Sequence, residues 1–276
     1  STITIDGADN VDVNGGETGF IRAGNETGSS GTINVFDGGV ITNDADGILV
    51  VASNDGSEGI LNVDGAGSVF DFGANAFLSE DAEGARGNVI VTVSNGGTLE
   101  GDEIVNNGIL DVTSGGQLNA DLIQDNILRS STGIEDLGIN GNLTVNTAGF
   151  GFDYLVDGGA LTSHDTYTAT GDVVLDGLLI VLATSIVDLD GLSADLITGS
   201  SLTVSDGFSI QLVEFDVNSL TEVDSAALVA AVDNAIDLAF TADGTTLTVD
   251  FTGAGGGNLA SQIVGTNLLA ASEAIF

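Results

Sequence analysis

The segment Ile60–Val69, ILNVDGAGSV, decides the fold class of this chain, because its pattern recurs along the first half of the sequence. An alternating β-branched run is followed by a turn of Gly, Asn or Asp residues and then by a second apolar run. Five copies align without gaps, namely Thr2–Val11, Thr32–Ile41, Ile60–Val69, Ile90–Leu99 and Ile109–Leu118. Their first residues lie 30, 28, 30 and 19 positions apart, and a sixth, weaker copy begins at Asn142. Alternation predicts strands, and recurrence at a nearly fixed period predicts stacked repeats.

A third apolar stretch lies between successive copies. These stretches are Gly19–Ala23, Gly47–Ala52 and Asn75–Ser79, and a polar, glycine-rich link follows each of them. Three short strands in about 30 residues is the spacing of one coil of a parallel β-solenoid. Inward Ile, Val, Leu and Phe side chains would then stack on their equivalents about 4.8 Å away in the next coil. We therefore expect an all-β fold, a parallel β-solenoid with 28–30 residues per coil.

An antiparallel sandwich or barrel is the alternative interpretation, because short strands joined by Asn-Gly or Asp-Gly turns also predict hairpins. A sandwich, however, gives no reason for one ten-residue pattern to recur every 28–30 residues. The period therefore favours the solenoid over residues 1–125.

The glycine placement in the repeats resembles that of a known group of proteins. The stretches GTINVFDGG (Gly31–Gly39), GILNVDGAGS (Gly59–Ser68) and VTVSNGGTL (Val91–Leu99) are similar to repeats of bacterial autotransporter passengers and of PEP-CTERM-associated surface proteins. Asp165–Leu182 is similar to sequences near passenger C-termini, with Tyr167 where an aliphatic residue is usual. The resemblance implies a right-handed β-helix in an exported protein, secreted or held at the extracellular cell surface.

The period weakens after Ile127, and we divide the chain there. Residues 1–128 form the solenoid repeat region, and residues 129–252 form a β-rich C-terminal region. One segment of that region, Ser225–Leu238 (SAALVAAVDNAIDL), has apolar residues at helical spacing and Asp224 or Ser225 as N-cap, which predicts one short helix. Residues 253–276 begin as a Gly-rich linker and continue as an apolar terminal arm.

The charge balance excludes several functions. The chain has 41 Asp and Glu residues against three Arg and no Lys, which gives a formal net charge of −38. Such a surface repels nucleic acid and anionic membranes, and no apolar run reaches membrane-spanning length. We therefore expect no nucleic-acid partner and no membrane insertion. Cysteine is absent, which excludes disulfides and thiolate chemistry.

Calcium is the metal that the acidic turns favour. Hard cations take oxygen ligands from Asp, Glu, Asn and backbone carbonyl groups, often in Gly-containing loops. The candidate ligands are Asp44, Asp46, Asp55, Glu58, Glu80, Asp81, Glu83, Asp188 and Asp190. None of these clusters matches the EF-hand loop, and each taken alone is also typical of a solvated turn. Collectively, the charge of the chain predicts structural calcium, with halophilic adaptation as the competing explanation.

Catalysis has weaker support in the sequence. β-Helix lyases use an Arg or Lys base, whereas Arg86 is interpreted as the counter-charge of the acids just before it. Glycosidases need two carboxylates, a criterion without specificity among 41 acids, and the chain has no Trp for sugar stacking. His164 lies between Ser163 and Asp165, but adjacent residues point in different directions. We therefore expect an exposed turn histidine and no catalytic residue.

These observations together predict an extracellular structural protein. An uncapped solenoid end exposes unpaired strand edges, and the first strand begins near Thr2. We expect identical chains to assemble head to tail into surface filaments, a matrix or a layer, stabilised by calcium, with the arm at 258–276 adding a strand to a neighbour. The alternatives are a monomeric adhesin or passenger stalk that contacts surface glycans or other cells, and a polysaccharide-acting β-helix enzyme.

Overall fold

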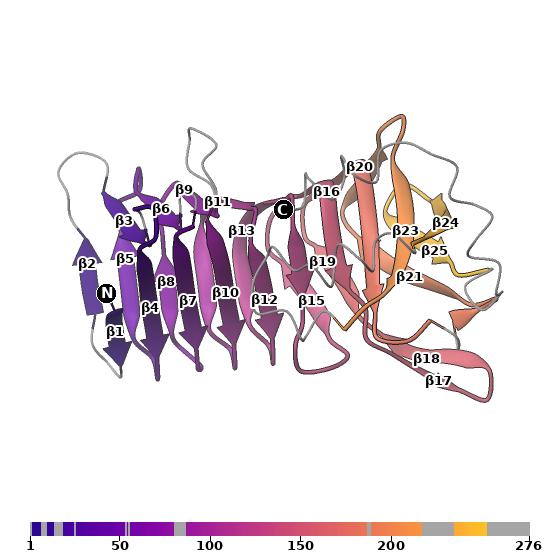
Figure 1. Cartoon of the computed structure of the whole chain (residues 1–276), viewed down its shortest axis with the longest axis horizontal. Helices are drawn as coiled ribbons and strands as arrows, with labels where there is room; N and C mark the ends of the chain where they lie inside the picture. Colours follow the sequence, from indigo (N-terminus) through magenta and orange to yellow (C-terminus); the bar gives the residue numbers. More distant parts are fainter. Residues whose placement is uncertain are drawn as a thin grey trace.

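The computed structural model describes residues 2–6, 10–13, 19–24, 26–52, 54, 56–79, 87–186, 189–216 and 235–252. These residues form 25 β-strands and no α-helix, which confirms the all-β prediction. Figure 1 shows most strands side by side in one elongated stack, with the N-terminal strands at one end.

Most strands belong to three parallel stacks, in which each strand pairs with the equivalent strand one coil away. The first stack comprises β1 (Thr2–Asp6), β4 (Ser30–Phe36), β7 (Glu58–Asp64), β10 (Asn88–Ser94), β12 (Ile109–Thr113), β14 (Ile127–Arg129) and β23 (Ser209–Glu214). The second comprises β2 (Asn10–Val13), β5 (Val40–Asn43), β8 (Val69–Asp71), β15 (Asp136–Ile139), β19 (Thr166–Ala169) and β21 (Ser193–Thr198). The third comprises β3 (Phe20–Ala23), β6 (Ile48–Val51), β9 (Asn75–Leu78) and β22 (Ser201–Val204).

Four longer strands bend and serve two stacks each. β11 (Thr98–Asn106) and β13 (Gln117–Gln124) run from the second stack into the third. β16 (Leu143–Gly151) and β20 (Asp172–Ala183) run from the third stack into the first. These bends keep the parallel pairing continuous along the whole stack.

The register confirms the repeat that the sequence predicts. In the first stack Thr2 pairs with Thr32, Thr32 with Ile60, Ile60 with Ile90, and Ile90 with Ile109. These residues begin the five aligned copies, so the spacing between copies in the sequence is the length of each coil. The three apolar stretches between copies form β3, β6 and β9, also as predicted.

The sixth copy, predicted to begin at Asn142, is wrong. Ile109 pairs with Ile127, so the next coil of the first stack already begins at Ile127. Leu143, which follows Asn142, lies in the third stack and pairs with Leu122. Because this coil lacks the long link of the earlier ones, pattern matching at the longer period selects a strand of the wrong stack.

The short coils turn sharply because one strand continues around the corner. β11 pairs with β8 up to Glu100 and with β9 from Glu103, and a bulge lies between these residues. A Cβ atom at Gly101 would lie 2.2 Å from a ring carbon of Phe72 and 2.5 Å from the carbonyl oxygen of Gly73. Only glycine fits so close an approach. Gly101 therefore permits the bend within β11, whereas the coil is shorter because only Asn107 and Gly108 separate β11 from β12, in place of the long link that separates β9 from β10.

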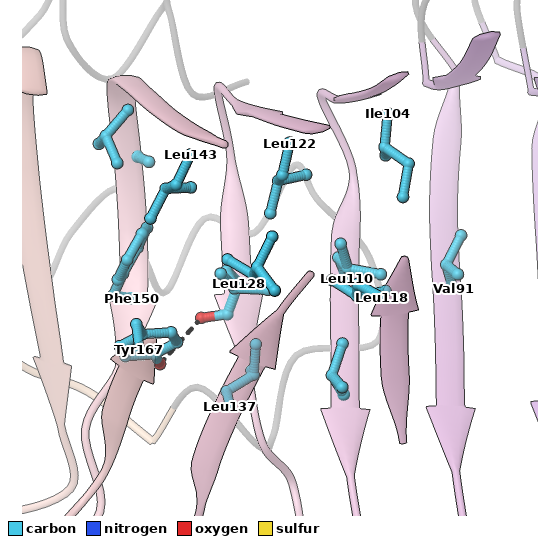
Figure 2. Close-up of a cluster of buried hydrophobic side chains, with 14 of the residues drawn as sticks. Val91, Ile104, Leu110, Leu118, Leu122, Leu128, Leu137, Leu143, Phe150 and Tyr167 are labelled. Carbon is cyan, nitrogen blue, oxygen red and sulfur yellow. Dashed lines mark hydrogen bonds between the residues drawn. The ribbon is translucent and has the colours of Figure 1, made fainter. Parts of the chain in front are cut away.

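An apolar core lies between the three stacks. In the first stack Ile33, Leu61, Val91 and Leu110 share one register column and are 0–1% exposed. Figure 2 shows the inward side chains of later strands, such as Leu128, meeting in the same core. Each fully buried aliphatic side chain contributes about 1.5–3 kcal/mol relative to exposure. The coils are therefore held together by stacked apolar columns as well as by backbone hydrogen bonds.

An antiparallel hairpin covers part of the C-terminal end. β24 (Ile236–Ala242) pairs with β23, and β25 (Thr246–Asp250) pairs with both β24 and β21. The buried ring of Phe251, just after this hairpin, lies 5.4 Å from that of Phe152. The hairpin therefore covers the C-terminal ends of the first and second stacks. A second hairpin, β17 (Tyr154–Asp157) and β18 (Ala160–His164), projects from the C-terminal half in Figure 1.

The helix predicted at 225–238 needs correction at its end. Ile236, Asp237 and Leu238 begin strand β24, because antiparallel pairing with β23 extends the backbone there. Residues 225–234 and the predicted arm at 253–276 lie outside the described residues. Parallel pairing continues past residue 128 as far as β23. The division of the chain at that residue and the right-handed sense of the coil stay predictions.

Candidate assembly site at the ends of the third stack

In the described residues, the strand at each end of the third stack has a neighbouring strand on one side only. Among the described strands, β3 pairs only with β6, and β22 pairs only with β20. The turn of the C-terminal hairpin makes one contact with the outer edge of β22, where the Leu202 N–H group donates to the Gly244 carbonyl oxygen at 2.7 Å. The N–H and C=O groups of such an edge can pair with another strand.

The inward column of the third stack is apolar from one end to the other. It consists of Ile21, Leu49, Ala76, Ile104, Leu122, Leu143, Val173 and Leu202. The six internal side chains are 0–1% exposed, whereas the terminal Ile21 and Leu202 are only partly buried. The two ends of the column therefore present apolar side chains that lack the outer neighbour found everywhere else in the column.

The first stack is also uncovered at its N-terminal end. Ile3 pairs in register with Ile33, and Ile33 is 1% exposed while Ile3 is 49% exposed. The difference arises because, among the residues that can be described, no coil lies outside β1. The apolar core is therefore open at this end of the solenoid.

Outward side chains at the two ends of the third stack share register columns. The column that contains Arg22 passes through Val50, Phe77, Val105, Ile123, Thr144 and Val174 to Thr203. Phe20 and Ser201 hold equivalent outward positions, each one residue before the inward Ile21 and Leu202. Phe20 is 50% exposed, and the Arg22 guanidinium lies 4.8 Å from the centre of its ring. A copy that continued the stack would place Arg22 beside Thr203.

The two ends differ in charge. Arg22 is exposed on β3 at the N-terminal end, whereas Arg129 is buried. Residues 189–216 and 235–252, at the other end, contain no Arg or Lys. Their exposed acids include Asp195, Asp206 and Asp243. The N-terminal end also contains Asp6 and Asp12, on β1 and β2, so Arg22 reduces the like-charge repulsion between the two ends without reversing it.

The predicted calcium ligands occupy turns and strand ends. Asp44 and Asp46 share the turn between β5 and β6, exposed Glu58 begins β7, and Asp190 is exposed in the turn before β21. Within the described part of the chain, no three acidic or histidine side chains gather closely enough to hold a metal ion. The other predicted ligands lie outside the described residues, namely Asp55, Glu80, Asp81, Glu83 and Asp188. Calcium binding stays a prediction.

Asn43, beside the Asp44 turn, braces the corner. Its Nδ2 donates to the carbonyl oxygens of Gly19 and Phe72, at 3.1 and 3.2 Å, one coil away on either side. Its Oδ1 accepts the Asp44 N–H group at 3.0 Å. The amide therefore satisfies buried backbone groups of three successive coils.

Many carboxylates accept hydrogen bonds from neutral side chains one coil away. The Asp64 carboxylate accepts bonds from the Ser94 hydroxyl and the Asn95 amide, both at 2.6 Å. Asp172 accepts the Ser201 and Ser200 hydroxyls, and these bonds lower its pKa. Sequence reasoning missed these ladders. The sequence pattern that predicts such hydrogen bonds is an Asp that aligns with a Ser, Thr or Asn one coil length away in the sequence.

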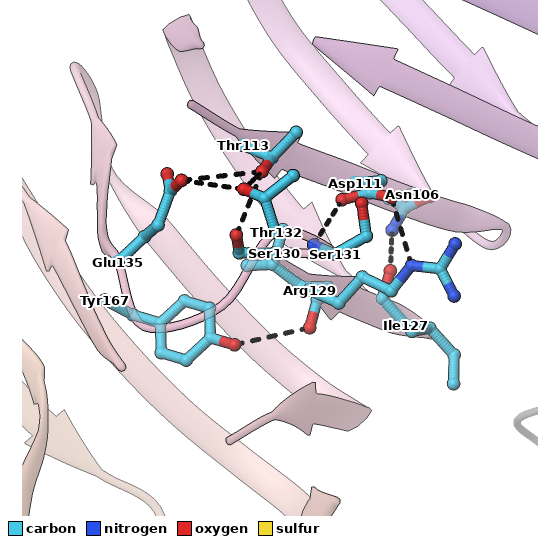
Figure 3. A network of polar contacts seen from close by, with 11 residues as sticks. Asn106, Asp111, Thr113, Ile127, Arg129, Ser130, Ser131, Thr132, Glu135 and Tyr167 are labelled. Atoms are coloured by element: carbon cyan, nitrogen blue, oxygen red, sulfur yellow. Dashed lines mark hydrogen bonds and ion pairs between the residues drawn. The ribbon is translucent and has the colours of Figure 1, made fainter. Parts of the chain in front are cut away.

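A polar network joins β12 and β14, and the pair at its centre, Asp111 and Arg129, is buried (Figure 3). The Arg129 Nε donates to the Asp111 carboxylate at 3.3 Å, and Asp111 also accepts the Ser131 N–H group at 3.0 Å. The Glu135 carboxylate accepts the Ser114 N–H group at 2.7 Å and the Thr132 hydroxyl at 2.9 Å. Arg129 and Asp111 occupy paired register positions. The arginine is therefore part of the scaffold and does not extend into solvent.

His164 differs from the exposed turn residue that the sequence predicts. It ends strand β18, pairs with Tyr154 and is half-buried, and its ring lies 5.6 Å from that of Phe152. Its Nδ1 lies 2.8 Å from the carbonyl oxygen of Asp165. The Asp165 carboxylate accepts backbone N–H groups instead of bonding to the imidazole. Ser163, His164 and Asp165 therefore do not form a catalytic triad.

Comparisons with known proteins assign no family. The described residues contain no helix with the length and apolarity needed to cross a membrane. No protein family, no curated protein and no solved structure matches this chain. What is established is the architecture, a parallel β-solenoid in which β3 and β22, at the two ends of the third stack, each pair with one strand only among the described residues.

Proposed function

We propose that this chain is an exported structural solenoid that assembles head to tail, through its third stack, into filaments, a matrix or a layer outside the cell. One observation carries the proposal: the apolar column from Ile21 to Leu202 is fully buried except at its two ends. Contact between Leu202 of one copy and Ile21 of the next buries both side chains and pairs β22 with β3, with the β3 edge taking the place of the Gly244 carbonyl oxygen at the Leu202 N–H group. A head-to-tail contact that does not close into a ring gives a fibre.

The repeat resemblance supports the extracellular part of the proposal. The placement of glycine in repeats such as Gly31–Gly39 is similar to that in autotransporter passengers and PEP-CTERM-associated surface proteins. We therefore propose a passenger-like role at the cell surface for this chain. The proposal gives the chain no catalytic function. Its partners are further copies of itself and, at the surface of the assembly, glycans or other cells.

The proposal also gives cations a role, which is to screen the repulsion between copies. With a formal charge of −38, two copies repel each other at low ionic strength. Arg22 reduces that repulsion at the contact, and calcium or salt screens the remainder. Turns such as Asp44–Asp46 offer carboxylates to calcium on the outside of each copy.

A monomeric adhesin or passenger stalk is the second candidate. The hairpin β24–β25 favours it, because this hairpin covers two of the three stacks at the C-terminal end. A stalk remains monomeric in calcium, whereas a filament subunit polymerises.

Negative-stain electron microscopy of the purified protein, in calcium and in a chelator, tests the proposal. We expect long, regular fibres in calcium and shorter or fewer fibres after chelation. Monodisperse single particles under every condition would exclude head-to-tail assembly and favour the stalk.

A matched pair of variants tests whether the contact between copies involves β3. Phe20→Ser removes a side chain that is 50% exposed on the open strand β3, and Ile60→Ser removes one that is 40% exposed on the internal strand β7. We expect Phe20→Ser to slow or abolish fibre growth and Ile60→Ser to leave it unchanged. Equal effects of the two substitutions would place the contact elsewhere.

A further inference from the structure

The first stack is apolar on its outer side as well as on the side that faces the core. Its outer apolar face forms a cluster separate from the main core and consists of Ile109, Ile127, Ile180, Leu182 and Val213. These side chains belong to β12, β14, β20 and β23 and are 0–2% exposed. The residues that follow them in the chain, such as Leu110 and Leu128, lie in the core between the stacks. The strands of this sheet are therefore buried on both sides.

Exposure falls steeply along one outward column of this sheet. The column runs through Ile60, Ile90, Ile109 and Ile127, which pair in register from one coil to the next. Ile60 is 40% exposed and Ile90 is partly buried, whereas Ile109 and Ile127 are fully buried. Ile60 shows the exposure of an outward isoleucine that nothing covers. The outer apolar face is therefore covered from β12 onward.

The described strands do not supply this cover. The described apolar residues packed against the face belong to the same sheet, except Phe215 and Ala235, which lie just after β23 and just before β24. The Gln211 Oε1 atom, paired in register with Ile180, is buried and accepts no hydrogen bond from the described residues. A buried acceptor of this kind calls for a donor from whatever covers it. The cover is therefore another segment of this chain or another molecule.

The charge of the face selects one segment of the chain. Asp111 and Arg129 lie among the apolar side chains and neutralise each other as an ion pair. Residues 258–276 contain one acid, Glu273, and no base, whereas residues 217–234, the other long segment outside the described residues, contain three acids. Burial of an unpaired carboxylate against an apolar face is costly. The face therefore suits the nearly uncharged arm at 258–276.

The arm is long enough to cover the face and begins close to it. From Val213 back to Ile109 the face spans four coil steps, about 19 Å. Residues 258–276 span about 28 Å as a helix, and more when extended. The last described residue follows Phe251, whose ring lies 5.4 Å from that of Phe152, and the Phe152 N–H group donates to the Leu182 carbonyl oxygen at 2.9 Å. The chain therefore leaves the solenoid beside the face.

We propose that residues 258–276 fold back along the first stack of their own chain and cover the outer apolar face from Val213 to Ile109. The arm then shields β12, β14, β20 and β23 on the side opposite to the core, and its backbone N–H groups provide donors for Gln211. It is part of the folded subunit and is not available to add a strand to a neighbour. Assembly through the third stack does not require it.

Cysteine reactivity measures the cover directly, because the chain has no cysteine of its own. Three single variants report on three environments: Ile127→Cys on the outer apolar face, Ile60→Cys at the uncovered end of the same column, and Leu128→Cys in the core. We expect N-ethylmaleimide to label only Ile60→Cys rapidly in the full chain. Removal of residues 258–276 should raise the labelling rate of Ile127→Cys at least about tenfold, by exposing a group that otherwise reacts only on local opening, and leave Leu128→Cys protected.

Two results would overturn the proposal. If Ile127→Cys stays protected after removal of the arm, residues 217–234 or a second copy provide the cover. If labelling of Ile127→Cys in the full chain speeds up on dilution, the cover comes from another molecule. These rates are measured on single copies, so they do not depend on whether fibres form.

Reactive Leu128→Cys in the shortened chain would show that this chain does not fold, and a second pair of variants then decides. Ile263→Asp with Leu268→Asp places two charges at apolar positions of the full-length arm and should raise the labelling rate of Ile127→Cys. Ser261→Asp with Ser272→Asp, at polar positions of the same arm, is the matched control and should leave the rate unchanged. Equal rates in the two pairs would overturn the proposal.

Discussion

Acidic side chains in this solenoid are bound mainly by neutral donors from the neighbouring coil. Asn142 donates two hydrogen bonds to Asp121 across one coil, and Thr166 and Thr168 both donate to Asp136. Hydrogen bonds to an ionised acceptor are stronger than those between neutral groups. A chain with only three cationic side chains can therefore accommodate 41 acids without an ion pair for each.

The sequence predicted where acids lie but not how they are bound. Turn positions such as Asp44 and Asp46 follow directly from the glycine pattern. The positions of the hydrogen-bond donors do not follow from this pattern. Asp121 and Asn142 can be recognised as neighbours only when the coil length is known, and that length changes along the chain. The sequence therefore predicts calcium from charge alone, without the hydrogen bonds that stabilise many of the same carboxylates.

Asp111→Ala tests the buried ion pair. The substitution removes the carboxylate that bonds to Arg129 and to the Ser131 N–H group, and both charged residues are at most 6% exposed. We expect the free energy of unfolding to fall by about 3–5 kcal/mol, because a buried cation loses its counter-ion. Urea denaturation measures the change. Asp157→Ala, at an exposed position, is the control and should stay within about 0.5 kcal/mol.

Gly101→Ala tests the corner within β11. The added methyl group would meet the ring of Phe72 and the Gly73 carbonyl at under 3 Å, so we expect a loss of about 1–3 kcal/mol in the free energy of unfolding. Gly138→Ala is the control, since a Cβ there meets no atom within 4 Å and the residue lies in strand β15. Equal unfolding midpoints for the two variants would contradict the role given to Gly101.

At the scale of strands, regular coils could be predicted and irregular ones could not. The first three coils keep a nearly constant period, so alternation and glycine turns located all their strands. The later coils depend on β11 and β13, which bend around a corner without a turn signal. The helix prediction was wrong at residues 236–238. Ile236, Leu238 and Phe240 also follow the alternating pattern of a strand, and pairing with β23 stabilises the strand.

Deletion of one whole coil tests the register. Removal of Thr32–Gly59 takes out the complete segment between two equivalent positions, so Ile60 would pair with Thr2 in place of Thr32. We expect a folded protein with a β-rich circular dichroism spectrum and a cooperative unfolding transition. Removal of Thr32–Asp44 alone breaks the register and should give an unfolded or aggregated product. A cooperative fold after both deletions would contradict the stacking.

At the scale of the whole molecule, the solenoid has two unlike ends. The N-terminal end exposes β3 with Phe20 and Arg22, and the C-terminal end combines a hairpin with β22, which pairs with one strand and accepts one contact from the hairpin turn. Unlike ends of one axis meet head to tail, and such a contact repeats without limit. The contact predicted here is narrow, because only the third stack continues across it, so we expect assembly to depend strongly on salt and cations.

Cysteine cross-linking between copies tests this account most directly. Arg22 and Thr203 end the same register column, so a continued stack places them within disulfide reach, about 4.4–6.8 Å between Cα atoms. The chain has no cysteine, so Arg22→Cys with Thr203→Cys adds the only two thiols. In oxidising buffer of moderate salt we expect a ladder of reducible oligomers, and no ladder from Arg22→Cys with Ser201→Cys, which is two residues out of register and retains Phe20. Free thiols on monomers in both double variants would contradict head-to-tail assembly through the third stack.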